Sequence, residues 1–263
     1  MTYINYSKEE TQREVIRLAK ASASEDWCPQ GGWQFPFDFG DGIIAPTYTP
    51  IQEMHTWRRQ VMLSTIERLV PADQRAATSI LDIGGGEGAM SIGLWQIGFR
   101  DITMLEARPL NIEKAKFAGN HFHAGIQFKL TTIEDFLQKN DKNYDITLFM
   151  GLLYHLLNPF EILKSIGLLT NRHMIIESAL AQPRLNGFDN RADYSPSDAG
   201  FFVRIDTVLS QTAGLSDFEL WPNMAAVKTL VQYAGFNELQ LLEGKNPPKD
   251  FASNSRMIAL ASK

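Results

Sequence analysis

The sequence predicts an α/β fold in which helices cover both faces of a doubly wound sheet, and three observations support it. Short apolar stretches of strand character alternate with stretches of helical period between residues 78 and 178. A glycine-rich turn, 84–88, follows the first of these strands. The chain has 263 residues, 44% of them hydrophobic, which suffices for one large core. Repeated alternation of strand and helix is typical of a parallel sheet.

The region before the sheet is expected to form two helices joined by a long loop. Residues 11–23 have an amphipathic helical pattern, and residues 51–70 form a second helix that ends before Pro71. The loop, residues 27–50, is dense in aromatic residues, prolines and glycines. Such a segment is either a lid over a binding site or a hydrophobic plug that seals the core. We assign residues 1–70 to this N-terminal region and residues 71–263 to the sheet domain.

Strands and helices are expected to alternate regularly along the sheet domain. Strands are predicted at 78–83, 101–106, 126–130, 144–150 and 172–178, with helices at 88–98, 109–119, 133–139 and 159–169. Pro109 and Pro159 stand where the first turn of a helix tolerates proline. Residues 179–222 form an insertion after the fifth strand. A helix at 224–234 and strands near 237–243 and 255–261 then complete the chain.

The first strand, the turn and the following helix are typical of a nucleoside-binding unit. Glycines allow the backbone to turn tightly and to approach a ligand, which then meets the positive end of a helix. Glu106 ends the next strand, at the place where a carboxylate can accept the ribose hydroxyls. The glycines alone fit either NAD or S-adenosylmethionine (SAM). Asp82, just before the turn, would repel a pyrophosphate but suits the cationic groups of SAM, so SAM is favoured.

At this point the chain resembles the class I SAM-dependent methyltransferases, within them the branch related to the tRNA wobble-uridine carboxymethyl transferases and similar bacterial small-molecule methyltransferases. The resemblance runs over roughly residues 80–261. It rests on these elements: Leu81–Gly88, Glu106, Ile133-Glu134, Phe149–His155, Trp221-Pro222-Asn223 and Gly235-Phe236. Weaker similarity at Trp33 and Asp41–Ile43 extends it toward the N-terminus. The resemblance implies a Rossmann-like, seven-stranded sheet, SAM as cofactor and S-adenosylhomocysteine (SAH) as product.

The resemblance also implies a set of cofactor-binding residues. It assigns Asp82 and the turn to the methionine moiety, Glu106 to the ribose, and Ile133 with Glu134 to the adenine. The full set is Asp82, Gly84, Gly85, Gly86, Gly88, Glu106, Ala107, Ile133, Glu134, Met150 and Gly151. Two alternatives stay open from the residues themselves: Glu106 as a solvated strand end, and Glu134 as an acid that the helix dipole favours.

One departure from the tRNA branch bears on the substrate. In that branch two arginines follow the Tyr-His pair, whereas Leu156 and Leu157 stand here. The charge suited to a carboxylated cofactor is missing, so we expect ordinary SAM and O- or N-methylation of a small molecule. A net charge of −5 without basic runs argues against a nucleic-acid partner. A tRNA-modifying transferase, an NAD-dependent oxidoreductase and a non-catalytic SAM-binding protein stay open.

Methyl transfer mainly requires positioning, and an acceptor hydroxyl or amine also benefits from a base. His155 is the candidate base because it follows the strand at 144–150, at the edge where ligands bind; the alternative is an imidazole satisfied by nearby backbone. Tyr154 either shapes the methyl pocket or is a half-buried aromatic residue. These two residues form the predicted catalytic set.

Acceptor binding is assigned to residues on the N-terminal loop, the fifth strand and the insertion: Trp33, Phe35, Glu177, Arg184 and Arg204. The loop 27–50 and the insertion 179–222 are expected to close together over the acceptor. His55, Arg58 and Arg59 share a helix and either bind an acidic acceptor or form a solvated face. Arg191, in the insertion, carries the same two interpretations.

Composition adds expectations about location and metals. The single cysteine, Cys28, cannot form an internal disulfide, and the polar N-terminus lacks signal-peptide character. The longest apolar stretch, Leu148–Leu157, is too short to span a bilayer. We therefore expect a cytoplasmic protein without membrane contact. No His/Cys spacing typical of a metal site occurs, so no metal is expected. A homodimer is left open.

Overall fold

The computed structural model describes residues 3–23, 28–47, 49–181, 199–205 and 215–263. A seven-stranded sheet forms its centre, in the order β3-β2-β1-β4-β5-β9-β8. The strands are β1 (Ser79–Ile83), β2 (Asp101–Glu106), β3 (Gln127–Leu130), β4 (Tyr144–Met150), β5 (Thr170–Ala179), β8 (Glu238–Leu241) and β9 (Arg256–Ser262). Strand β9 runs antiparallel to both of its neighbours, while β1 to β5 are parallel. The predicted fold class is confirmed.

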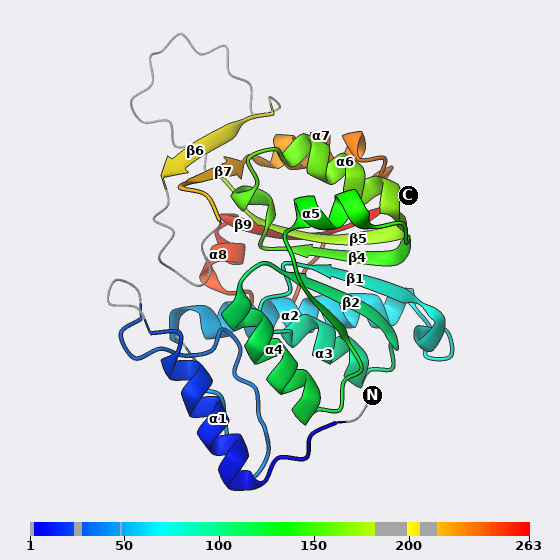
Figure 1. Ribbon diagram of the computed structural model, residues 1–263. Coiled ribbons are helices and arrows are strands. Elements are labelled where there is room, and N and C mark those ends of the chain that lie inside the picture. The colour runs from blue at the N-terminus through cyan, green and yellow to red at the C-terminus, as the bar shows by residue number, and fades with distance from the viewer. Residues whose placement is uncertain (1–2, 24–27, 48, 182–198, 206–214) are drawn as a thin grey trace.

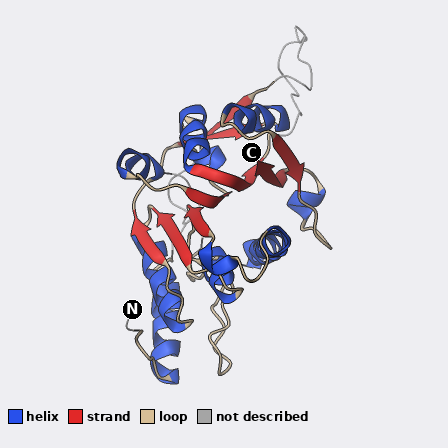
Figure 2. Cartoon of the chain, turned by 90° about the vertical axis from the view of Figure 1, so that its right-hand side faces the viewer, coloured by secondary structure: helices blue, strands red, loops and turns tan. Residues whose placement is uncertain are grey.

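Helices cover both faces of the sheet (Figures 1 and 2). One layer contains α2 (Thr49–Leu69), α3 (Ala89–Gln96) and α4 (Pro109–His121), and the other contains α5 (Ile133–Lys139), α6 (Pro159–Leu169) and α7 (Met224–Tyr233). The N-terminal α1 (Lys8–Lys20) lies beside the first layer, and three short helices complete the described chain: η1 (Arg75–Ala77), η2 (Leu153–His155) and α8 (Lys249–Ala252). In this part of the chain, no helix combines the length and apolar composition needed to cross a membrane.

Alternate residues of the central strands supply two separate hydrophobic clusters. Ile80 and Ile102 join the cluster under α2, α3 and α4, whereas Leu81 and Leu105 join the one under α5, α6 and α7. Successive side chains of a strand point to opposite faces, so a strand buried on both faces is apolar throughout. This explains why the sequences of the central strands are continuous apolar stretches rather than alternating polar and apolar residues.

The aromatic loop is a structural plug over much of its length. Trp33, Phe37 and Phe39 are buried in the same cluster as the sheet, and the indole Nε1 of Trp33 donates to the carbonyl of Val15 at 3.1 Å. Trp33 has no exposed surface and does not line the main pocket. The prediction that Trp33 binds substrate is therefore wrong, because the large apolar ring is needed in the core.

The insertion contains an antiparallel ribbon that was not predicted. Its strands are β6 (Phe201–Ile205) and β7 (Phe218–Pro222), and β7 lies against η2. The ribbon projects from the end of the molecule at which β4 stops (Figure 1). Arg184 and Arg191 lie outside the described residues. The ribbon therefore extends the wall of the site that begins at the end of β4.

Candidate active site

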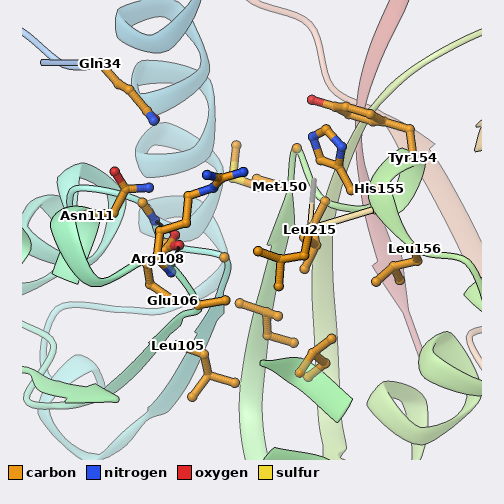
Figure 3. A pocket seen from close by; sticks show the side chains of 18 of the residues that line it. Gln34, Leu105, Glu106, Arg108, Asn111, Met150, Tyr154, His155, Leu156 and Leu215 are labelled. Carbon is orange, nitrogen blue, oxygen red and sulfur yellow. Dashed lines mark hydrogen bonds between the residues drawn. The ribbon is translucent and has the colours of Figure 1, made fainter. Parts of the chain in front are cut away.

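A pocket of about 730 Å³ lies at the carboxyl ends of β1, β2 and β4. Residues on the two sides of Figure 3 come from different elements: Glu106, Arg108 and Asn111 on one side, Tyr154 and His155 on the other. Parallel strands bring their carboxyl ends to one edge, which is where open α/β sheets bind ligands. The topology alone thus assembles most of the predicted cofactor residues around one cavity.

The glycine turn forms the base of the pocket. The amides of Gly84 and Gly85 both donate to the carbonyl of Leu105, at 2.9 and 3.0 Å. A Cβ on Gly85 would come within 2.4 Å of Met104 Cγ, and Gly86 has a φ of 56°, a backbone conformation that favours glycine. Gly88 precedes α3 and does not line the pocket. The turn therefore requires glycine, because a side chain at position 85 would collide with Met104 and one at position 86 would strain the backbone.

Asp82 is buried just before the turn. Its Oδ2 accepts a hydrogen bond from the hydroxyl of Ser91 at 2.7 Å, and the residue lines the pocket. Burial raises the pKa of Asp82 to about 6, because removal from water disfavours the charged carboxylate. A cationic ligand group beside this carboxylate would reverse that effect.

Glu106 is fixed by two backbone amides. Its Oε2 accepts from the amide of Gly86 at 3.0 Å and its Oε1 accepts from that of Arg108 at 2.8 Å. Burial raises the pKa of Glu106 although these hydrogen bonds oppose the change. The carboxylate is thus oriented, rather than being the solvated strand end considered as an alternative.

The expected adenine site also lines the pocket. Ile133 and Glu134 begin α5, whose N-cap Thr132 accepts a hydrogen bond from the amide of Asp135 at 3.1 Å. Ala107, Met150 and Gly151 line the same cavity. All the predicted cofactor residues except Gly88 therefore meet in one pocket, and contact of each with the cofactor stays a prediction.

His155 and Tyr154 form the opposite wall. Both belong to η2, which follows β4 directly, and both line the pocket (Figure 3). The His155 side chain is 6% exposed, and its Nδ1 lies 3.2 Å from Oε1 of Glu219. Within the described residues, Nε2 of His155 makes no hydrogen bond, whereas Nδ1 has the Glu219 carboxylate as its polar neighbour. A buried imidazole with a free ring nitrogen in a pocket wall is suited to accept a proton.

Glu219 is a site residue that the sequence analysis missed. It lies on β7, and its Oε2 accepts a hydrogen bond from Nε1 of Trp221 at 2.7 Å. Burial opposes charge on Glu219, but the contacts with His155 and Trp221 outweigh it and hold the pKa of this carboxyl below its ordinary value. Arg204 stacks over the Trp221 ring at 5.1 Å and lines the pocket, and its contact with an acceptor stays a prediction.

Glu177 lies behind the pocket wall and not in it. The side chain is completely buried between Arg256, whose Nε lies 2.7 Å from Oε1, and Arg58, whose Nη2 lies 3.2 Å from Oε2. Burial opposes the charge of Glu177, yet the two guanidinium groups hold its pKa below the ordinary value. The prediction that Glu177 binds substrate directly is corrected, because both carboxylate oxygens face arginines.

Glu87 joins the N-terminal segment to the glycine turn. Its carboxylate accepts from the amides of Gln34 at 2.7 Å and Phe35 at 3.3 Å, and pairs with Nζ of Lys114 at 2.8 Å. Both ionic side chains are almost fully buried. Gln34 and Phe35 line the pocket in consequence. The predicted contact of Phe35 with substrate is therefore compatible with its position.

In the parts of the chain described, no three or more His, Cys, Asp or Glu side chains gather in a group that would hold a metal ion.

A family model for a methyltransferase domain matches residues 54–222. The chain belongs to this methyltransferase family. The match begins within α2 and includes the glycine turn, η2 and β7, and so it contains residues from both sides of the pocket. The methyltransferase is also similar to the tRNA U34 carboxymethyltransferase of Wolinella succinogenes, with 23% identity over 239 residues, 90% of this chain and 73% of that protein.

Two solved structures show the same fold. The N-terminal domain of EvdMO1, solved with SAH and D-fucose, matches with a TM-score of 0.67 and 21% identity over 98% of this chain and 97% of that one. The magnesium protoporphyrin IX methyltransferase of Synechocystis PCC 6803, solved with SAM, matches with a TM-score of 0.52 and 14% identity over 86% and 87% of the two chains. The cofactor is SAM, which decides between the two ligands that the glycine turn allowed.

Proposed function

We propose that this SAM-dependent methyltransferase methylates a hydroxyl group of a small-molecule acceptor, with His155 as the base. The observation that carries the proposal is Nε2 of His155, a buried nitrogen in the pocket wall without a hydrogen bond to any described residue. An unpaired buried polar atom costs free energy, so its retention in a cavity indicates a ligand partner. N-methylation by the same base is the second form of this reaction.

The size and shape of the pocket support a small acceptor. Its volume of about 730 Å³ lies within the range of roughly 300–1,000 Å³ typical of small-molecule sites. Glu106 and Arg108 line one side, and Tyr154 and His155 line the other (Figure 3). A cofactor on the first side and an acceptor on the second would thus share one cavity.

The residues present can perform the proton transfer. SAM supplies a methyl group already activated by its sulfonium. Glu219, close to Nδ1 of His155, favours the tautomer with the proton on Nδ1 and leaves the Nε2 lone pair free. The acceptor hydroxyl loses its proton to Nε2 while its oxygen bonds to the methyl carbon. With SAM bound, the carbon–sulfur bond would break with its electrons left on sulfur, so SAH would be the product.

Apolar side chains restrict the access of water to this reaction. Phe35, Leu156, Leu215 and Trp221 line the pocket around the polar groups. Because they come from the N-terminal loop, from the segment after η2 and from the insertion, three parts of the chain enclose the acceptor side. Exclusion of water strengthens electrostatic contacts and prevents competing hydrolysis.

Transfer of a labelled methyl group from SAM to a panel of sugars, phenols and amines tests the proposal. D-Fucose belongs in the panel because a protein of similar fold has been solved with it. His155→Ala should reduce kcat by about 10²-fold or more, while SAM affinity, measured by titration calorimetry, stays unchanged. His123→Ala, an exposed histidine outside the pocket, is the control. Full activity of His155→Ala, or binding of SAM without transfer to any panel member, would contradict the proposal.

A further inference from the structure

Two arginines share one glutamate behind the pocket wall. Arg58 on α2 and Arg256 on β9 both contact Glu177, and their side chains are 7%, 14% and 0% exposed, respectively. The cluster therefore carries two positive charges and one negative charge. A buried charge without a counterion is strongly unfavourable, so an excess cation in the interior is expected to meet an anion.

Neighbouring side chains do not compensate for this excess charge. His55 lines the pocket close by, and burial together with the charges of Arg58 and Arg256 holds its pKa well below the ordinary range. The phenol oxygen of Tyr154 accepts a hydrogen bond from Nη2 of Arg256 at 3.1 Å, but it does not balance the excess positive charge of the two arginines. His55 and Tyr154 thus leave the balance of the cluster unchanged.

The acidic residues nearby have other partners. Asp82 lies within electrostatic reach of Arg58, but its Oδ2 bonds to Ser91, and we assign this carboxylate to the ammonium group of SAM. Glu219 faces His155 and Trp221. Asp250 also lines the pocket, but it is exposed to solvent. None of these three carboxylates therefore neutralises the excess positive charge of Arg58 and Arg256.

Gly151 keeps this cluster open to the cavity. The residue follows β4 with a φ of 79°, and a Cβ there would lie 3.3 Å from Nη2 of Arg58 and 3.5 Å from Oε2 of Glu177. Arg58 and Arg256 line the pocket, whereas Glu177 does not. Among the described residues Glu177 is the only ion-pairing partner of Arg58, whose buried Nε has no hydrogen bond. A guanidinium face thus remains available to a ligand.

We propose that Arg58 and Arg256 bind a carboxylate of the acceptor, so that the substrate is a hydroxy acid. This inference rests on the proposed function, which places the acceptor hydroxyl at His155. A guanidinium matches the planar geometry of a carboxylate and binds it through two hydrogen bonds. Arg256 also stacks on the Tyr154 ring at 5.2 Å, on the His155 side of the pocket, which favours the acceptor over the cofactor as the source of the carboxylate.

Binding to the protein–SAH complex tests the inference with matched probes. Calorimetry would compare D-galacturonate with D-galactose, and 4-hydroxybenzoate with 4-hydroxybenzamide. Each pair differs in a carboxylate at one position. In at least one pair the acid should bind about tenfold or more tightly than its neutral partner, as expected for charge-assisted hydrogen bonds. Equal affinities within both pairs, or no binding by any probe, would overturn the proposal.

Substitutions identify where the carboxylate binds. Arg58→Met and Arg256→Met should each remove about ten- to hundredfold of the affinity for the acid, while Arg58→Lys should retain part of it. Arg68→Met is the matched control, because Arg68 is exposed on the same helix and lies outside the pocket. Circular dichroism and Tm would verify that each variant is folded, and a preference for acids that survives in folded variants would contradict the assignment.

Two further measurements separate the possible failures. SAH affinity of Arg58→Met and Arg256→Met should equal that of the wild type; a parallel loss of SAH affinity would mean that the arginines bind the methionine carboxylate and would overturn the proposal. His155→Ala should keep the preference for each acid over its neutral partner, because the two arginines are unchanged, although both members of a pair lose the contact of their hydroxyl with Nε2. Methyl transfer to neutral acceptors alone would refute this inference and leave the proposed function intact, whereas preferred binding of acids without any transfer would refute only the proposed function.

Discussion

Nδ1 of His155 lies 3.2 Å from Oε1 of Glu219, a contact that joins the turn after β4 to a ribbon inserted after β5. The carboxylate is itself held by the indole of Trp221 at 2.7 Å. A carboxylate fixed in this way determines the tautomer and orientation of the imidazole. The insertion therefore lines the pocket and also provides the residue that would orient the proposed base.

Glu219→Gln should lower kcat and leave SAM affinity unchanged. The amide keeps the size of the side chain but removes the charge beside Nδ1, so the loss approaches the roughly 10²–10⁴-fold that one general base contributes. Steady-state kinetics with saturating SAM would measure it. Glu238→Gln, an exposed acid on β8, is the control. Equal kcat values for wild type and Glu219→Gln would show that His155 needs no carboxylate partner.

SAM binding should weaken as the pH falls through about 6, the value to which burial raises the pKa of Asp82. Above this pH the carboxylate is charged and attracts the ammonium group of SAM; below it, the neutral acid does not. Without ligand, the stability of the folded protein depends on pH in the opposite direction. Burial of the protonated Asp82 costs less than burial of the carboxylate, so the stability that protonation contributes is present at low pH and is lost as the pH rises through about 6.

Calorimetric titration with SAM between pH 5 and 8 would measure this dependence. Binding near pH 6 should also release a proton, which is visible as a heat that changes with the ionisation enthalpy of the buffer. Asp82→Asn should bind SAM weakly at every pH and show a flatter profile. An Asp82→Asn profile as steep as that of the wild type would assign the titration to another group.

Strong local patterns made most of the sheet predictable. Strands 101–106 and 144–150 and helices 133–139 and 159–169 match the predicted bounds, because apolar runs, Pro159 and the Thr132 cap mark their ends. Helix α1 begins at Lys8, three residues before the predicted start. Ser7 accepts from the amide of Glu10 and Glu10 accepts from that of Ser7, a capping box that the apolar pattern alone did not reveal.

The site was predictable where motifs carry it and not where distant contacts do. The glycine turn and Glu106 have a fixed spacing, whereas Glu219, Arg256 and Lys114 reach the site only through the fold. Trp33 illustrates the opposite error, because the sequence does not distinguish an aromatic ring in a binding wall from one in the core. Buried ion pairs join residues far apart in the chain, so a single sequence gives no signal for them.

Bulk tRNA should bind weakly to this protein, although the Wolinella succinogenes relative is a tRNA U34 carboxymethyltransferase. The net charge is −5, and the pocket is lined by Leu156 and Leu157, at the two positions where the resemblance to the tRNA branch leads us to expect arginines. Electrostatic contact with phosphates dominates nucleic-acid affinity and falls steeply with salt. Filter binding at physiological salt, with and without SAM, would measure the affinity. Submicromolar, salt-sensitive binding together with methylation of a tRNA nucleotide would instead support the alternative that the protein is a tRNA-modifying transferase.

Lys114→Met should be strongly destabilising, because it leaves Glu87 buried without its cation. Breaking a buried ion pair from one side costs about 3–5 kcal/mol of unfolding free energy. Here Glu87 also holds the amides of Gln34 and Phe35, so the N-terminal segment should loosen along with the glycine turn. Urea denaturation would give the free energy, and limited proteolysis near residue 30 would detect the loosened segment.

The double variant Glu87→Gln/Lys114→Met distinguishes a buried pair from two independent side chains. Removing both charges should cost clearly less than the sum of the single changes, since no uncompensated charge stays in the core. Glu113→Ala is the matched control: Glu113 is adjacent to Lys114 on α4, is about half exposed and pairs with Arg17 on the surface. Such surface pairs contribute about 0–1 kcal/mol. Additive costs at Glu87 and Lys114 would show that the pair does not act as a unit joining the N-terminal segment to the cofactor turn.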